Sequence, residues 1–199
     1  MTLIKSISGI RGTIGGKVNE GLTPVDAVKF AAAFGTWLIR RNPNAKVKVV
    51  IGRDARISGQ MISDLVSSTL VGLGIDVINL GLSTTPTVEV AVPIEGAHGG
   101  IILTASHNPK QWNALKLLNQ KGEFISGSDG ELVLSIADNE DFDFAEVDNL
   151  GHVTNDDSYL QKHIDAILEL DVINREAIEA ADFSVVVDAV NSTGGIFVP

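Results

Sequence analysis

The stretch GGIILTASHNPKQWNALKL, Gly99 to Leu117, joins an apolar run to a polar loop and then to a second apolar run. Gly100–Leu103 has the composition of a buried strand, and Ala114–Leu118 has that of the next one. The loop between them places Ser106 and His107 side by side directly after the first strand. This order predicts a strand that delivers a serine to the edge of a β-sheet.

Helical and extended patterns alternate on both sides of this stretch. We expect helices over residues 23–41, 58–73, 85–92, 127–138, 158–168 and 174–181, and strands over 47–51, 77–80, 100–103, 114–118 and 183–188. Such alternation indicates an α/β fold, a three-layer α/β/α domain with a mixed, mostly parallel sheet and helices on both faces. Because parallel strands end at one edge, the loops 52–56, 81–86 and 104–109 are expected to converge there.

The pattern is interrupted after residue 138 by the acidic run 139–149, which is typical of a linker or an exposed loop. We therefore divide the chain into a first domain, residues 1–150, and the start of a second, similar α/β domain, residues 151–199. The apolar segment Phe183–Asp188 is predicted to be a buried strand of that second domain. We expect the chain to hold one complete domain and the first part of another.

The composition and net charge indicate which kind of protein this is and which partners it could bind. Apolar residues make up 44% and charged residues 20% of the 199 residues, values typical of a globular protein. The formal net charge of -10 argues against nucleic acid and against a membrane surface, because both need a dense basic footprint. The absence of cysteine and of a secretion signal favours a cytoplasmic location. A small anion is not excluded, since a few converging basic side chains can hold a phosphate; the oligomeric state is left open.

Two simple interpretations of the Ser-His pair come first. A hydrolase would need His107 to take the proton of Ser106, but adjacent side chains of an extended segment point to opposite sides. The chain also has no Gly-x-Ser-x-Gly elbow. The second interpretation is a plain turn, because serine and Asn-Pro are common in turns. The hydrolase is therefore disfavoured. Whether the segment is only a turn depends on which residues are expected near Ser106.

Several cations are predicted to lie near this serine. Lys116 returns on the following strand, Arg53 and Arg56 leave a neighbouring strand, and Arg11 lies between glycines that permit close approach to an anion. Each has a structural alternative: an ion pair with Asp54 for the two arginines, a solvated turn for Arg11, an edge-strand charge for Lys116. Taken together, a serine among several cations is suited to carry a phosphate.

These motifs resemble those of a known family. Thr104–Pro109, with Asn113 and Lys116 downstream, resembles the active-site loop of the α-D-phosphohexomutases, which include phosphoglucomutase, phosphomannomutase and phosphoglucosamine mutase. Three further segments resemble, in order, the family's N-terminal Ser-Gly-Ile-Arg-Gly, its Gly-Arg-Asp-x-Arg-x-Ser motif and the start of its second domain: Ser8–Gly12, Gly52–Gly59 and Val187–Asn191. The resemblance implies an enzyme, an isomerase that interconverts hexose 1-phosphate and hexose 6-phosphate.

The resemblance also implies roles for individual residues. Ser106 would be the phosphoserine that passes its phosphoryl group to a sugar phosphate through a bisphosphate intermediate. Lys116 would act as general base and acid, with His107 assisting. Substrate and phosphate would be bound by Arg11, Arg53, Arg56 and Asn108. The implied cofactor is Mg²⁺, held by the phosphate on Ser106 and by aspartates of an Asp-Gly-Asp-x-Asp-Arg loop in the second domain.

The chain departs from the family pattern in ways that limit this expectation. No such aspartate loop follows Asp188 in the sequence, and Ala114 stands where the family has glycine. We expect the chain to carry the phosphorylatable serine without a complete metal site, and to lack mutase turnover on its own. Two alternatives stay open: a phosphoglucosamine mutase, and a non-catalytic module that binds phosphosugars.

Overall fold

The computed structural model describes residues 1–6 and 9–199, so Ser8 of the Ser-Gly-Ile-Arg-Gly motif lies outside the described residues. The strands are β1 (Ile4–Ser6), β2 (Gly9–Thr13), β3 (Lys48–Arg53), β4 (Asp76–Leu82), β5 (Gly99–Leu103), β6 (Trp112–Leu118) and β7 (Val153–Asn155). The helices are α1 (Pro24–Arg41), α2 (Gly59–Gly72), α3 (Thr85–Ile94), α4 (Gly127–Asn139), α5 (Tyr159–Leu168), α6 (Arg175–Ala180) and α7 (Gly194–Phe197), with a 3₁₀ turn at Val147–Asn149.

In the described chain, the seven strands form one mixed sheet in the order β1-β2-β6-β5-β3-β4-β7. The pairs β5-β3, β3-β4 and β4-β7 are parallel, whereas β6 pairs antiparallel with both β5 and β2, and β2 with β1. The mixed α/β sheet predicted from the sequence is therefore confirmed. Four predicted strands correspond to β3, β4, β5 and β6; the sequence patterns did not reveal β1, β2 or β7, which are short or rich in glycine.

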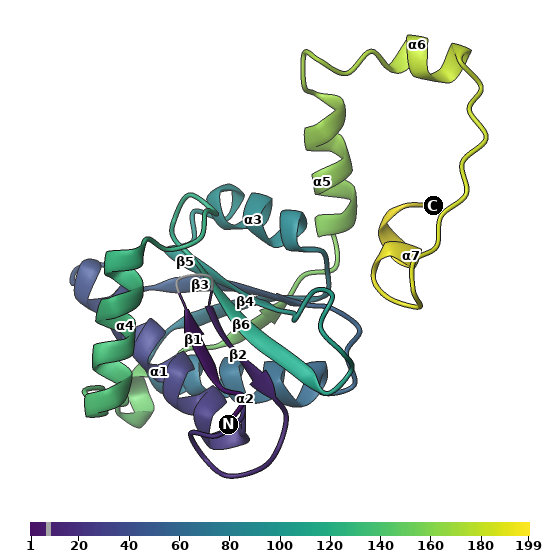
Figure 1. Ribbon diagram of the computed structural model, residues 1–199. Coiled ribbons are helices and arrows are strands. Elements are labelled where there is room, and N and C mark those ends of the chain that lie inside the picture. The colour runs from purple at the N-terminus through teal and green to yellow at the C-terminus, as the bar shows by residue number, and fades with distance from the viewer. Residues whose placement is uncertain (7–8) are drawn as a thin grey trace.

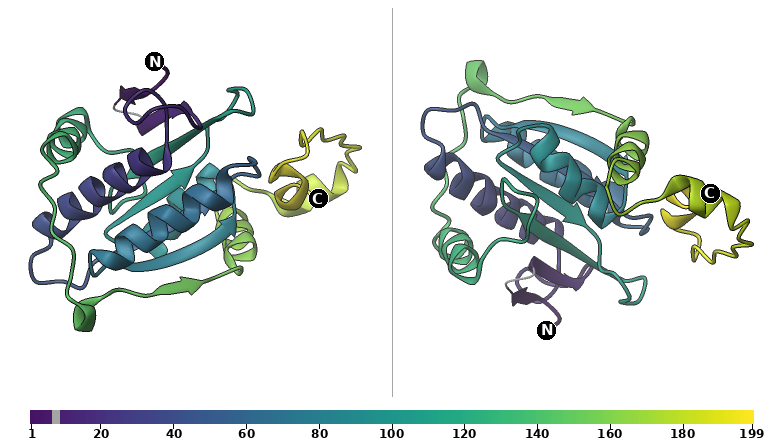
Figure 2. Two further views of the ribbon diagram at one scale, coloured as in Figure 1. Left: turned by 90° about the horizontal axis from the view of Figure 1, so that it is seen from below. Right: turned by 90° about the horizontal axis from the view of Figure 1, so that it is seen from above.

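Helices cover both faces of the sheet, so the domain has three layers (Figures 1 and 2). The helices α1, α2 and α4 enclose the larger core on one face, where Phe30, Phe34 and Leu70 are fully buried. On the other face, α3 and the start of α5 enclose a smaller core that includes Val88 and Tyr159. Burial of these apolar side chains is the main force that fixes the helices against the sheet.

The helix predicted over 23–41 begins as its sequence indicates. Thr23 is the N-cap residue and forms a capping box with Asp26, while Pro24 occupies the first turn. The Thr23 hydroxyl accepts a hydrogen bond from the Asp26 amide, and the Asp26 carboxylate accepts one from the Thr23 amide. These bonds satisfy amides that have no partner within the helix, which fixes where α1 starts.

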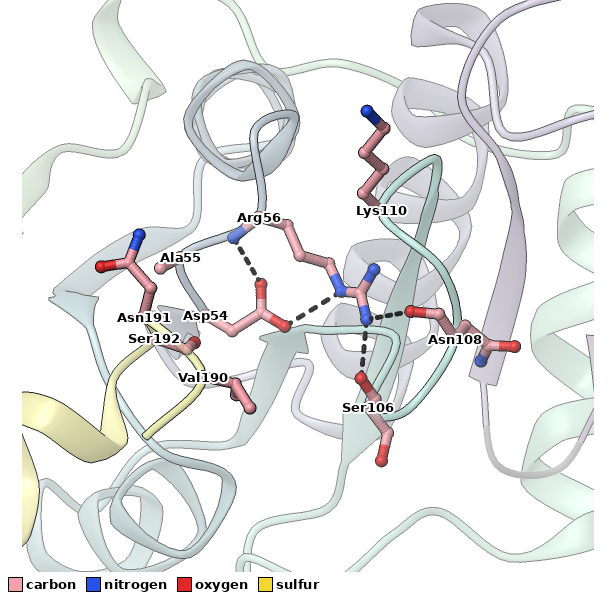
Figure 3. Close-up of a pocket in the computed structure, with 9 residues that line it drawn as sticks. All are labelled: Asp54, Ala55, Arg56, Ser106, Asn108, Lys110, Val190, Asn191 and Ser192. Carbon is pink, nitrogen blue, oxygen red and sulfur yellow. Dashed lines mark hydrogen bonds and ion pairs between the residues drawn. The ribbon is translucent and has the colours of Figure 1, made fainter. Parts of the chain in front are cut away.

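The C-terminal part of the chain differs from the prediction. Residues 183–189 form no strand, and Val186 is 99% exposed, so the buried strand predicted over Phe183–Asp188 is wrong for this structure. An apolar run becomes a strand only where a neighbouring strand can pair with it, and within the described chain none does. From α5 through α6 the chain projects away from the sheet, and it then turns back, so that Val190–Ser192 line a cavity together with Asp54 and Arg56 (Figures 1 and 3).

The sheet continues past residue 150, because β7 pairs with β4 in parallel through Val77 and Val153. The division into domains 1–150 and 151–199 stays a prediction. No helix in the described residues is long and apolar enough to cross a membrane.

Candidate active site

The segment Thr104–Gln111, here called the serine loop, connects β5 to β6 at the carboxyl edge of the parallel strands. The loop after β3 reaches it directly, because the Asp54 amide donates a hydrogen bond to the Leu103 oxygen at 3.1 Å. The loop after β4 lies beside the same edge, where the Ser83 amide donates to the Arg53 oxygen at 2.8 Å. The predicted convergence of the three loops is therefore confirmed.

An open cavity of about 280 Å³, here called the serine cavity, lies on one side of this loop. Five of the residues predicted for the site line it: Arg11, Ser106, His107, Asn108 and Lys116. Three are cationic or can become so, and Ser106 and His107 are exposed. The cavity therefore combines an accessible hydroxyl with positive charge, which suits a phosphate group.

The serine loop is a turn and not an extended segment. Ser106 has a φ of 52°, in the left-handed region that residues with side chains seldom adopt. Asn108 closes the turn, because its side-chain amide and its backbone amide both donate to the Ala105 oxygen, at 2.8 and 3.0 Å. The extended backbone assumed in weighing the hydrolase is therefore wrong, and both Ser106 and His107 line the same cavity.

Arg11 reaches the serine cavity from β2. This strand pairs antiparallel with β6, which places Arg11 opposite Ala114. Gly9, at the start of β2, also lines the cavity and has a φ of 115°. A side-chain carbon at Gly9 would lie 2.2 Å from the Leu115 oxygen, so only glycine fits this approach of two strands.

Lys116 lies on β6, opposite Ile102 of β5, and is half-buried. Its ammonium nitrogen lies 5.8 Å from the ring centre of Phe124, a cation–π contact. Burial raises the pKa of the Glu89 carboxyl, and the positive charge of Lys116 opposes that rise. Glu89 on α3 thus lies close enough for its charge to interact with the lysine.

The two predicted arginines after β3 have different surroundings. Arg56 forms an ion pair with Asp54 at 3.1 Å, the structural alternative considered from the sequence. It lines a second cavity of about 280 Å³ on the other side of the serine loop (Figure 3). Arg53 lines neither of these cavities; it donates to the Gln60 side chain at 2.8 Å and to the Asp54 oxygen at 3.2 Å. The structure thus brings six of the seven predicted side chains to the serine loop.

Comparison with known proteins places this arrangement in a family. Residues 3–144 match the family described as phosphoglucomutase/phosphomannomutase, alpha/beta/alpha domain I. The chain belongs to this family. The resemblance read from the sequence motifs is therefore confirmed.

Individual relatives agree with this assignment. The chain is 37% identical over 94% of its length to a phosphoglucomutase/phosphomannomutase of Thermococcus kodakarensis, covering 41% of that protein. It is 34% identical over 96% of its length to a probable phosphoglucosamine mutase of the same organism, covering 39% of it. A solved phosphoglucomutase/phosphomannomutase family protein from Burkholderia thailandensis superposes with a TM-score of 0.67 at 24% identity, over 84% of this chain and 36% of that one, which supports the fold alone. The chain spans about two fifths of the length of the curated relatives it matches.

The described residues of this family member do not by themselves make a metal centre. No group of three or more His, Cys, Asp and Glu in the described residues could hold a metal ion. The carboxylate beside the serine loop, that of Asp54, is already bound to Arg56 and to Thr104. Of the ligand set that the resemblance implied, the part of the chain that the structure describes includes Ser106, the residue expected to carry the phosphate.

Sequence reasoning assigned no site role to three residues of this candidate site. Asp54 was considered only as an ion-pair partner and Thr104 only as the first residue of the loop motif. The Thr104 hydroxyl donates to Asp54 at 2.7 Å and accepts from the Ser106 amide at 3.2 Å. Phe124 was not expected at the site; an isolated bridge with Leu118 brings it back over β6. Leu118 and Phe124 lie six positions apart in the sequence. A predicted hairpin turn after Leu118 would have indicated that Phe124 returns to β6.

Proposed function

We propose that this chain provides the phosphoserine half of a phosphosugar mutase that interconverts hexose 1-phosphate and hexose 6-phosphate. The observation that carries the proposal is the serine cavity, in which the exposed Ser106 hydroxyl shares one space with Arg11, His107 and Lys116. Phosphoryl transfer depends mainly on positioned groups and on positive charge around the transferred phosphate. The membership of the chain in the phosphoglucomutase/phosphomannomutase family supports the same reaction class.

In the proposed reaction, a hydroxyl oxygen of the hexose monophosphate attacks the phosphorus of phosphorylated Ser106. A bond forms between that oxygen and phosphorus, and the bond from phosphorus to Ser106 Oγ breaks. Lys116 takes the proton of the attacking hydroxyl as general base and then passes it to the leaving serine oxygen as general acid, with His107 assisting the transfer. The resulting hexose bisphosphate reorients and returns its other phosphoryl group to Ser106 by the reverse steps.

The proposal includes a metal cofactor, a cellular location and a substrate. Mg²⁺ would neutralise phosphoryl charge when bound, with the Ser106 phosphate as one ligand; its remaining ligands are not among the residues that the structure describes. A cytoplasmic location is supported by a composition without cysteine. The hexose phosphate itself is the proposed partner, recognised through its phosphate by Arg11 and by the polar groups of the serine loop.

The nearest alternative within the family is a phosphoglucosamine mutase. It is favoured by a specific observation, because one of the relatives that the chain matches over 96% of its length is named a probable phosphoglucosamine mutase. Both alternatives use the same serine and the same cavity. They differ in the sugar, so turnover of glucosamine phosphate against glucose and mannose phosphates decides between them.

The test uses the protein at its full natural length. After incubation with a hexose 1,6-bisphosphate and Mg²⁺, intact-mass measurement is expected to show one added phosphoryl group, which peptide mapping locates at Ser106. The substitution Ser106→Ala is expected to remove both this phosphate and mutase turnover. Ser128→Ala provides the matched control, because Ser128 is an exposed serine on α4 and does not line the serine cavity.

The outcomes separate the mutase from a binding module. Phosphosugar binding without any phosphate on Ser106 would favour the non-catalytic module. Turnover that survives Ser106→Ala would exclude the phosphoserine role.

A further inference from the structure

Arg56 makes an unusually complete set of hydrogen bonds. A guanidinium has five N–H groups, and in Arg56 each of them has an acceptor. The Nε group donates to Asp54 Oδ2 at 3.1 Å. The four remaining groups donate to backbone oxygens of the serine loop and the first residue of β6: Ser106 at 2.7 Å, Asn108 at 2.9 Å, Pro109 at 2.9 Å and Trp112 at 3.0 Å.

A second path leads from the same arginine to the amide of Ser106. Asp54 Oδ2, which binds Arg56, also accepts the hydroxyl of Thr104 at 2.7 Å. The Thr104 oxygen in turn accepts the Ser106 amide at 3.2 Å. Both backbone polar groups of Ser106 are therefore tied to the Asp54–Arg56 pair, the carbonyl directly and the amide through Thr104.

These bonds act on a residue with a sparsely populated backbone conformation. Ser106 has a φ of 52°, a conformation that persists only where its surroundings hold it. In Figure 3 the carbonyl oxygen of Ser106 faces Arg56, whereas its hydroxyl points away from the arginine. The arginine side chain is only 11% exposed, so its bonds compete little with water.

We infer that Arg56, together with Asp54, is a positioning residue that fixes the direction of the Ser106 hydroxyl, and that it does not bind the phosphate of the substrate. To hold a phosphate, the guanidinium would have to give up one of its five bonds to the loop or to Asp54. The inference rests on the proposed function in one respect, since the hydroxyl it positions is the proposed phosphoryl carrier. It replaces the phosphate-binding role expected for Arg56 from the sequence.

The experiment compares Arg56→Lys with Arg40→Lys in the full-length protein. A lysine keeps the charge at position 56 but has three donors and no planar fork, so it cannot replace five directed bonds. Arg40 is a matched control, because it also binds a carboxylate and a backbone oxygen, both of Asp141, far from the serine loop. Three quantities are measured: kcat, KM for the hexose phosphate, and hydrogen exchange of serine-loop amides.

For Arg56→Lys we expect kcat to fall roughly 10²-fold, the cost of a small misplacement of a reacting group, with KM unchanged. The serine-loop amides are expected to exchange faster. Arg40→Lys is expected to change none of the three quantities. If Arg56→Lys does not fold, Thr104→Val breaks only the path to the Ser106 amide and is expected to shift kcat and exchange in the same direction.

The inference is overturned if Arg56→Lys raises KM while kcat and loop exchange stay at the wild-type level, because that is the pattern of a lost phosphate contact. The inference is also overturned if Arg56→Lys changes neither kcat nor the hydrogen exchange of the serine-loop amides. Failure of the proposed function looks different: wild-type protein would show no phosphate on Ser106 and no turnover. The exchange measurement would then still decide whether Arg56 holds the loop.

Discussion

Two five-residue runs of this chain contain consecutive β-branched residues but differ in structure. GGIIL, Gly99–Leu103, forms the central strand β5 with every residue buried. FSVVV, residues 183–187, has three β-branched residues against two in GGIIL, yet it forms no strand and its side chains are exposed. The first run leads into the serine loop, and the second leads into a segment that includes Asp188, Asn191 and Ser192.

The difference lies in what surrounds each run. β5 has β3 on one side and β6 on the other, so its amides and carbonyls are paired on both edges. After Tyr159 the described chain has one further buried residue, Thr193. The comparison shows that an apolar pattern reports the capacity to form a strand, whereas neighbouring strands and a covering layer decide whether one forms.

The largest effect is expected from a charge placed in the buried run, GGIIL. Ile101 is fully buried in the larger core between β3 and β6. Ile101→Asp would bury a carboxylate without a partner, so we expect a loss of at least about 4 kcal/mol from a total stability of about 5–15 kcal/mol. Urea unfolding followed by circular dichroism measures this.

A control substitution at the same position separates the effect of the buried charge from the effect of altered packing. Ile101→Val keeps the strand and removes one methylene group, and we expect it to cost about 0.5–1.5 kcal/mol. A small effect of Ile101→Asp would mean that β5 is not the centre of the cooperative core.

The contrast also explains which features the sequence could predict. The helix starting at Thr23 and the strand β5 were predictable because a capping box and a continuous apolar run are local signals. The position of the Arg56 side chain was not, because four of its five acceptors lie 50 to 56 residues further along the chain. The left-handed conformation of Ser106 depends on the same distant bonds.

Only part of the candidate site could be predicted from the sequence. Residues that leave the carboxyl ends of neighbouring parallel strands must meet, so the meeting of the loops after β3 and β5 follows from topology. Which side of the serine loop each arginine would reach depends on side-chain packing. Arg53 turned toward Gln60 and Arg56 toward the loop, although the two lie three residues apart.

A moderate effect is expected at Tyr159, where the packed part of the chain ends. Its ring is buried, and its hydroxyl donates to Glu95 Oε1 at 2.6 Å. Tyr159→Phe removes this bond to a partly buried carboxylate, so we expect a loss of roughly 1.5 kcal/mol near neutral pH. Urea unfolding at pH 7 measures the loss.

The pH dependence supplies a sharper test of the same residue. Burial, and next the bond to Glu95, raise the pKa of Tyr159 well above its ordinary value of 10.0. Above pH 10 the unfolded phenol releases its proton while the folded one keeps it, so this contribution to stability is complete below pH 10 and declines above it. The wild-type protein is expected to lose stability more steeply than Tyr159→Phe between pH 9.5 and about pH 11. Equal slopes would indicate that the ring is not buried in solution.

The smallest effect on stability is expected from the same charge placed in the exposed run. Val186 is 99% exposed, so Val186→Asp removes no packing and buries no charge, and the free energy of unfolding should change by less than about 0.5 kcal/mol. What should change is self-association, because an exposed apolar segment with unpaired backbone groups favours contact between copies. Light scattering against concentration is expected to show less association for Val186→Asp than for the wild type. A stability loss approaching that of Ile101→Asp would mean that residues 183–187 are packed in solution, and the contrast between the two runs would then be wrong.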